Sequence, residues 1–123
     1  MVTLSDLLKG GAKKTGTSGN EQTASALHTA TAAETSFTTV AASLAAGATG
    51  QPLVLTAYGS VGGIVQIQFG SQAVYSLLVG PNAAPVNYPI PPTAFPNKVN
   101  SVNVQFQADG AGTLHGVVTF AVD

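Results

Sequence analysis

Residues 63–79 read GIVQIQFGSQAVYSLLV, and this stretch decides the fold class. Apolar residues alternate with glutamine before Gly70-Ser71, and a second β-rich run follows this dipeptide, which is typical of two strands joined by a two-residue turn. Closing the turn there predicts three pairs of facing residues, Phe69 with Gln72, Ile67 with Val74 and Val65 with Ser76.

The predicted register divides the side chains between two faces. The expected core face carries Val65, Ile67, Phe69, Val74 and Leu78. The opposite face carries Gln66, Gln68, Tyr75, Leu77 and Val79. This second face is neither a clean apolar core nor a charged exterior, and it therefore indicates a surface that binds another protein.

Further short β-rich runs, separated by turn residues, follow at the spacing typical of a sandwich or barrel. We expect strands near 36–43, 52–58, 63–69, 72–79, 85–90, 100–108 and 112–122. The loop Asp109-Gly110-Ala111 predicts a second hairpin, in which Phe106 pairs with Leu114 and Val102 with Val118. Six of the seven prolines lie in residues 81–96, which predicts an edge strand with extended loops, because proline cannot donate to a central ladder.

The expected fold is all-β: an antiparallel, jelly-roll-like sandwich of two sheets and about seven strands over residues 36–123. Residues 1–35 are expected to form an extended N-terminal arm. Thr3 and Asp6 ahead of Leu7-Leu8 predict a short helix, and residues 10–34 are rich in Gly, Ser, Thr and Ala without apolar periodicity, which predicts a flexible segment. We expect the arm to clasp a partner through Leu4, Leu7, Leu8, Lys13 and Lys14.

Charged residues make up only 7% of the chain, against about 25% in an ordinary soluble domain. Arginine is absent, and no charged residue occurs between Thr35 and Asn97. A monomer with so little surface charge has weak protection against self-association. The composition therefore predicts that neighbouring subunits cover much of the surface.

The sequence contains no constellation that supports catalysis, and we expect a protein without enzymatic activity. The carboxylates are Asp6, Glu21, Glu34, Asp109 and Asp123, and no pair of them is predicted to converge. His28 and His115 have no partner at metal-ligand spacing, and no Gly-x-Ser-x-Gly motif is present. A small β-sandwich enzyme remains an alternative, which loss of an activity on mutation of His115 would support.

Binding of cofactors, ions or nucleic acid is not expected either. The glycine-rich stretch 59–63 lacks the lysine of a phosphate loop, and Asp109 alone offers too few ligands for calcium. There is no cysteine, and Lys98 is the only basic residue of the expected β domain, which excludes a nucleic-acid face. We expect neither a signal peptide nor a membrane span, because the N-terminus lacks a basic region and polar residues interrupt every apolar run.

The whole pattern of an uncharged β domain, amide-rich outward faces, a proline-rich segment and a Gly/Ser/Thr/Ala-rich arm resembles the capsid decoration or cement proteins of tailed bacteriophages. The run Ala26-Leu27-His28-Thr29-Ala30-Thr31-Ala32 is similar to the His-Thr-Ala-Thr-Ala run in the arm of lambda-type head decoration proteins. The resemblance implies a virion protein on the outer capsid. Its partners would be the major capsid protein and copies of itself, as a trimer or dimer, with no small-molecule ligand.

An alternative function is a carbohydrate- or receptor-binding module of a phage fibre or adhesin. Tyr58, Tyr75 and Tyr88 combine an aromatic face with a polar tip, which suits stacking against sugars. Their separation along the chain favours packing or interface roles over a shared platform.

Overall fold

The structure is a computed structural model that describes residues 20–69 and 72–122. Within these ranges the chain forms eight strands and one short 3₁₀ helix. They are β1 (Glu21–Ala30), β2 (Thr38–Ser43), β3 (Gly50–Gly59), β4 (Gly63–Phe69), β5 (Gln72–Val79), β6 (Val86–Pro89), η2 (Pro92–Ala94), β7 (Ser101–Ala108) and β8 (Gly112–Val122). The all-β prediction is confirmed, and each of the seven expected strands has a counterpart.

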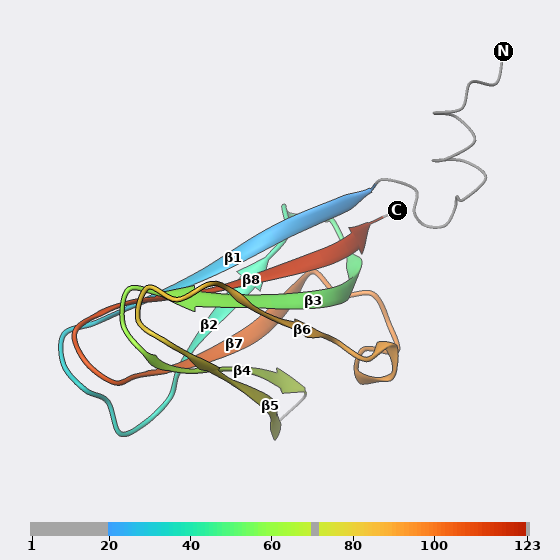
Figure 1. Ribbon diagram of the computed structural model, residues 1–123. Helices are drawn as coiled ribbons and strands as arrows, with labels where there is room; N and C mark the ends of the chain where they lie inside the picture. The colour runs from blue at the N-terminus through green and yellow to red at the C-terminus, as the bar shows by residue number, and fades with distance from the viewer. Residues whose placement is uncertain (1–19, 70–71, 123) are drawn as a thin grey trace, which may run out of the picture.

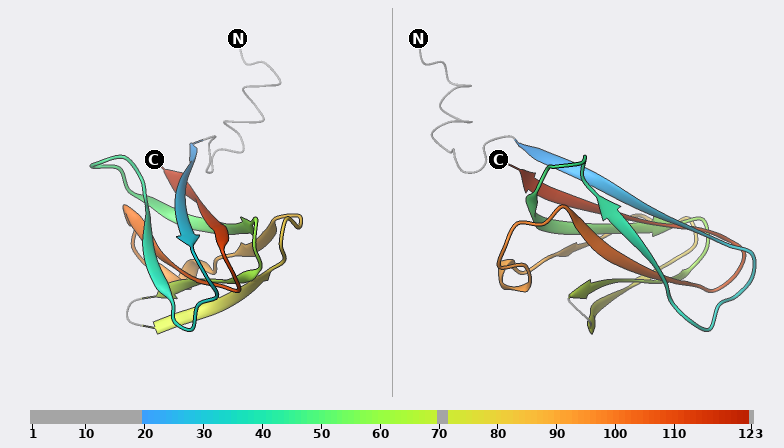
Figure 2. Two further views of the ribbon diagram at one scale, coloured as in Figure 1. Left: turned by 90° about the vertical axis from the view of Figure 1, so that its left-hand side faces the viewer. Right: turned by 180° about the vertical axis from the view of Figure 1, so that it is seen from behind.

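The strands form two antiparallel sheets of four, packed face to face (Figures 1 and 2). Sheet A has the order β1-β8-β3-β6, and sheet B has the order β2-β7-β4-β5. The pairs are nested: β1 pairs with β8, β2 with β7, β3 with β6 and β4 with β5. Only the β4–β5 connection therefore joins consecutive strands of one sheet, and every other connection crosses between the sheets.

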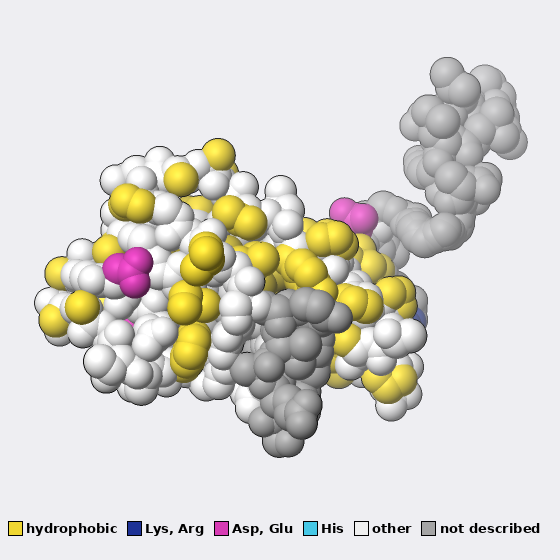
Figure 3. Space-filling view, turned by 60° about the horizontal axis from the view of Figure 1, so that its bottom comes forward, with side chains coloured by type: hydrophobic (Ala, Val, Ile, Leu, Met, Phe, Trp, Pro, Cys, Tyr) yellow, Lys and Arg dark blue, Asp and Glu magenta, His cyan; other side chains and the backbone are white. Residues whose placement is uncertain are grey.

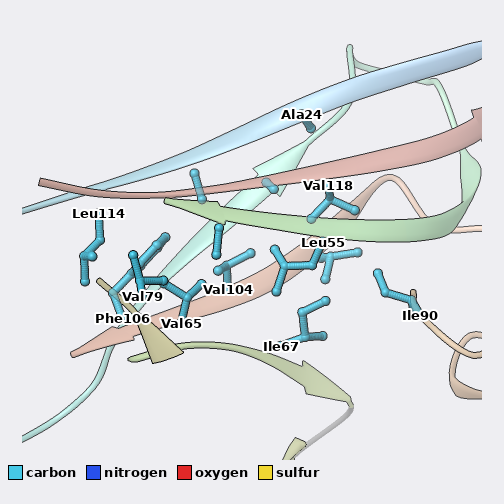
Figure 4. Packing of buried hydrophobic residues seen from close by; sticks show 14 of the residues in the cluster. Ala24, Leu55, Val65, Ile67, Val79, Ile90, Val104, Phe106, Leu114 and Val118 are labelled. Atoms are coloured by element: carbon cyan, nitrogen blue, oxygen red, sulfur yellow. The ribbon is translucent and has the colours of Figure 1, made fainter. Parts of the chain in front are cut away.

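The hydrophobic core lies between the two sheets (Figure 4). Its largest fully buried side chains include Phe106, Phe120, Leu55, Ile67 and Leu114. Burial of each such side chain stabilises the fold by about 1.5–3 kcal/mol. Alternate residues of β7 and β8 supply much of this core.

Gly116 sits at an inward position of β8, where the sheets approach closely. A Cβ atom at this position would lie 2.9 Å from Val104 Cγ1 and 3.4 Å from Phe106 Cζ. The first separation is too short for a real contact, so glycine is what allows β8 to pack over these side chains of β7.

The predicted boundary of the arm is wrong for residues 21–30, because they form β1 at the edge of sheet A. Every residue of β1 is in register with β8, from Glu21 opposite Ala121 to Ala30 opposite Gly112. Inward and outward side chains alternate, with Ala24, Ala26 and His28 buried. The β domain thus includes β1 and has eight strands instead of about seven.

The predicted hairpin around Asp109-Gly110-Ala111 is also wrong. β7 lies in sheet B and β8 in sheet A, so this loop carries the chain from one sheet to the other. Phe106 and Leu114 are both buried, but they face each other across the core instead of along a shared ladder. The alternation of apolar and polar residues identifies the core face of a strand whether its chain neighbour lies in the same sheet or in the opposite one. It therefore does not distinguish a hairpin from a loop that crosses between the sheets.

The β4–β5 hairpin closes as predicted for its first two pairs, Phe69 with Gln72 and Ile67 with Val74. A β-bulge between Gln66 and Ile67 then shifts the register by one residue, so that Ser76 lies opposite Gln66 and Leu77 opposite Val65. A shift of one residue reverses the faces. The predicted faces of the second half of β5 are therefore wrong: Val79 is buried, Leu77 packs against the core, and Leu78 is 77% exposed.

The proline-rich segment is an edge strand with extended loops, as predicted. β6 forms one edge of sheet A, and η2 follows it. The predicted short helix and the predicted clasping residues Leu4, Leu7, Leu8, Lys13 and Lys14 lie outside the described residues.

Candidate functional site

The outer surface of sheet B includes outward residues of the β4–β5 hairpin, where the sequence predicted a protein-binding surface. None of the four strands of sheet B contains a charged residue. Their outward positions carry amides, hydroxyls and a few aliphatic side chains. We call this set the sheet B face: Thr39, Ala41, Ile64, Gln66, Gln68, Ser76, Leu78, Asn103, Gln105 and Gln107.

A row of side-chain hydrogen bonds crosses this face from edge to edge. Ser76 Oγ donates to Gln66 Oε1 at 2.7 Å, and Gln66 Nε2 donates to Gln105 Oε1 at 2.9 Å. Gln105 Nε2 in turn donates to Thr39 Oγ1 at 3.1 Å. One residue from each of β5, β4, β7 and β2 takes part, because the register places these four residues directly opposite one another.

This row, which we call the amide row, fixes side chains that would otherwise rotate freely. Gln66 is only 7% exposed although it points away from the core, since its neighbours flank it on both sides. A long polar side chain loses about 1.5–2 kcal/mol of rotamer freedom when it is ordered. In the amide row this entropy is already lost when the chain folds, so a partner that binds does not have to order these side chains. The centre of the sheet B face is therefore a preorganised surface.

The rows beside the amide row offer further amide side chains and two large aliphatic side chains. Asn103 lies opposite Gln68, and Gln107 lies opposite Ile64, which in turn faces Leu78. Figure 3, a view that brings the lower side of Figure 1 forward, shows a mainly white and yellow surface with few, widely separated acidic groups. Such a surface can donate and accept neutral hydrogen bonds and bury aliphatic groups, and none of the residues named for the sheet B face is charged.

The outer surface of sheet A carries a different cluster. The Tyr58 and His115 rings stack in parallel, with centroids 4.6 Å apart and an interplanar angle of 5°. Leu27 lies opposite His115 on the other side and is 52% exposed. Tyr58, His115 and Leu27 thus form one row across β3, β8 and β1.

His28 occupies an inward position of β1, and a single carboxylate holds it. His28 Nε2 lies 2.9 Å and 2.8 Å from the two carboxylate oxygens of Glu34, and the ring stacks against Phe106 at 5.7 Å. The Glu34 amide donates to Ala108 O, and the Ala108 amide donates to Glu34 Oε1, each at 2.9 Å. Glu34 therefore links β1 of sheet A to the end of β7 in sheet B.

The pKa of Glu34 is below its ordinary value of 4.5. The main cause is the hydrogen bond from the Ala108 amide, which stabilises the carboxylate, and His28 adds a hydrogen bond and an attractive charge interaction. Burial acts in the opposite direction and raises this pKa. The pair is thus a structural link with an ionised carboxylate at neutral pH.

The predicted binding residues of the β domain are divided by the structure. Gln66 and Gln68 lie on the sheet B face, whereas Leu77 and Val79 turn toward the core because of the bulge. Tyr75 is in β5, and its side chain lies outside the described residues. The three tyrosines do not form one platform, since Tyr58 is on sheet A, Tyr88 packs against the core and Tyr75 belongs to sheet B.

Comparison with known proteins adds no relative. No family model matches the chain, and neither a curated protein nor a solved structure matches it significantly. In residues 20–69 and 72–122 there is no pocket and no group of three or more His, Cys, Asp or Glu residues placed to hold a metal. The same residues include no helix with the length and hydropathy needed to cross a bilayer.

The sequence prediction missed Gln105 and Ser76 as partners of Gln66, and Thr39 as the partner of Gln105. The registers of three strand pairs decide which side chains of the row meet, and the bulge that places Ser76 beside Gln66 has no clear sequence signal. The prediction also missed the link from His28 to Glu34. Inward and outward residues alternate from Ala24 to Ala30, as expected of a strand. Because alanine has a low propensity for strands, this alternation is a weak signal in the sequence.

Proposed function

We propose that this protein is a non-enzymatic structural subunit that docks through the sheet B face onto a larger protein assembly and stabilises it. The assembly that we propose is the outer capsid of a virion, in the manner of the decoration or cement proteins that the sequence resembles. The partners in this proposal are the major capsid protein and further copies of the chain.

One observation carries the proposal: four adjacent strands present an outer face with no charged residue and with its central amides already ordered. An exposed face on a free protein normally carries charges that keep copies apart. A neutral, preorganised face is suited to burial against another protein, because no ion has to be desolvated and little side-chain entropy is lost.

The order of the strands supports a jelly roll within this proposal. Two four-stranded sheets built from the nested pairs β1–β8, β2–β7, β3–β6 and β4–β5 are the arrangement expected when one long hairpin is rolled up. Jelly rolls form viral capsid domains and lectin domains. The fold alone therefore favours a virion protein and a glycan-binding protein equally, and only the residues of the candidate sites distinguish between these two functions.

Asn103→Lys tests the docking face. Asn103 is exposed on β7, so the lysine places a charge on the sheet B face with little effect on folding. In co-sedimentation with capsids of the encoding virus that lack this protein, we expect the variant to bind at least about 30-fold more weakly, since burial of an unpaired charge costs several kcal/mol.

Ala84→Lys is the matched control. Ala84 is exposed in the connection between β5 and β6, away from the outward positions of sheet B. This variant should co-sediment like the unmodified chain. Equal binding of both variants and the unmodified chain would refute docking through the sheet B face.

The second candidate function is glycan binding on sheet A, and the Tyr58–His115 stack favours it. An exposed ring held flat by a parallel neighbour is the group that sugars stack on. A glycan array probed with the unmodified chain and with Tyr58→Ala distinguishes the two functions. A glycan that binds the former and not the latter would support this second candidate, whereas capsid binding unaffected by Tyr58→Ala supports the first.

A further inference from the structure

β1 has an open edge. Val122 N donates to Asn20 O at 2.7 Å just before β1, and hydrogen-bonded pairs alternate along an antiparallel ladder. The inward residues from Gln22 to Ala30 therefore bond to β8. The main-chain N–H and C=O groups of the outward residues Thr23, Ser25, Leu27 and Thr29 point away from β8, and no described residue bonds to them.

β1 also lacks the features that normally protect such an edge. Monomeric β proteins interrupt their edge strands with proline, lysine, bulges or short length. β6 is four residues long and ends in Pro89, and β5 carries the bulge. β1 instead has ten residues in unbroken register, with no proline or lysine and with a charge only at Glu21.

We propose that β1 pairs antiparallel with β1 of a second copy of the chain, so that sheet A continues across two subunits. The register that covers most of the edge places Ser25 opposite Ser25 of the second copy. Five outward residues on each strand, Glu21 to Thr29, then exchange about ten main-chain hydrogen bonds. A closed two-fold dimer of this kind is the commonest form of homo-oligomer.

The side chains of β1 suit a copy of themselves. In the proposed register Thr23 lies opposite Leu27 of the second copy, Glu21 lies opposite Thr29, and no two charges meet. On the inner side Ala24 lies opposite Ala26, so two small buried side chains extend the core without crowding. This self-complementarity is what favours a second copy over an unrelated strand.

Leu27 supplies an independent observation. It is 52% exposed, one of the few large apolar side chains in the described chain that reach solvent to this extent. Facing residues of an antiparallel pair lie close enough for side-chain contact. Pairing therefore covers Leu27 with Thr23 of the second copy, once on each side of the two-fold axis.

This interface is separate from the sheet B face. Because inward residues of one strand face inward residues of the other, the two-fold axis stands perpendicular to sheet A. Both sheet B faces then point to the same side, and the dimer docks on one surface with two contacts, which raises its avidity. Loss of the dimer leaves each sheet B face intact, so the two proposals fail independently.

Ser25→Pro tests the interface in the full chain. The Ser25 N–H points to the open edge, so proline removes no β1–β8 bond but blocks strand addition. Ala41→Pro is the matched control, because Leu44 N donates to Asn100 O and the alternation directs the Ala41 N–H to the open edge of β2.

Sedimentation equilibrium up to about 100 μM should show a dimer for the unmodified chain and for Ala41→Pro. For Ser25→Pro we expect a dissociation constant at least about 100-fold higher. A monomeric unmodified chain would overturn the proposal, and so would a Ser25→Pro dimer of unchanged affinity.

Cysteine variants test the register of the proposed β1–β1 pairing. They also test the pairing itself if Ser25→Pro destabilises the fold. Across the axis the two Ser25 Cα atoms would lie about 5.5 Å apart, within disulfide range, whereas the two Thr23 Cα atoms would be about 14 Å apart. The chain has no other cysteine. Ser25→Cys should therefore oxidise to a covalent dimer and Thr23→Cys should not. Failure of Ser25→Cys, or equal yields from both variants, would overturn the pairing.

Discussion

The amide row makes a measurable contribution to stability, which Gln66→Ala tests. The substitution removes the hydrogen bonds to Ser76 and Gln105, worth about 0.5–1.5 kcal/mol each. It also removes one buried methylene, worth about 0.8 kcal/mol. Together these terms predict a loss of about 2–4 kcal/mol in the free energy of unfolding, or a Tm lower by about 8–15 °C for a domain of this size.

Gln68→Ala is the control for this prediction. Gln68 lies on the same strand and the same face, but its side chain makes no hydrogen bond to the described residues, so we expect a loss below about 1 kcal/mol. Both variants should be unfolded in urea at one fixed protein concentration, because self-association adds to apparent stability. Losses that agree within about 0.5 kcal/mol would refute the stabilising role of the amide row.

Two further substitutions test the packing between the sheets and the link from β1 to β7. Gly116→Ala forces a methyl group against Val104 and should lower the free energy of unfolding by about 1–3 kcal/mol in a denaturant titration, whereas an unchanged value would contradict the close approach. The stabilisation that the lowered pKa of Glu34 provides is complete above pH 4.5 and is lost as the pH falls through the folded-state pKa. The Tm difference between the unmodified chain and Glu34→Gln should therefore shrink below about pH 4.5, and a difference that stays constant with pH would show that the carboxylate charge is not involved.

Most of the fold could be predicted because apolar and polar residues alternate along most of the strands. The runs around Val65 and Val104 have large β-branched or aromatic residues on one face and amides on the other, and turn residues separate them. The partner of each strand was harder to predict. In this topology consecutive strands almost always belong to different sheets, so the chain neighbour is the pairing partner only for β4 and β5.

β1 was missed for a reason that lies in its side chains. Its buried positions are mostly alanine, which contributes little apolar area, and the fourth is His28. A buried histidine needs a polar partner, and Glu34 becomes that partner only after the chain has turned toward sheet B. Local composition therefore favours a flexible segment, while the tertiary contacts favour a strand.

The neutral composition of the candidate site could be predicted from the sequence, but the contacts between its side chains could not. The absence of charge and the outward glutamines of β4 are visible in the sequence, and they indicated a neutral protein-binding surface. Which glutamines are linked depends on the register of three strand pairs, and one bulge exchanges Leu77 and Leu78 between core and surface. Leu78, the most exposed large apolar side chain among the described residues, was for this reason assigned to the core.

Hydroxyl-radical footprinting of Leu78 tests docking through the sheet B face most directly. Leu78 is 77% exposed on sheet B, and Tyr58, 36% exposed on sheet A, is an internal reference. When the chain is bound to the capsid surface that we propose as its partner, oxidation of Leu78 should fall several-fold relative to the free chain, while oxidation of Tyr58 should persist. Oxidation of Leu78 at the same rate in the free and bound chain would contradict the account.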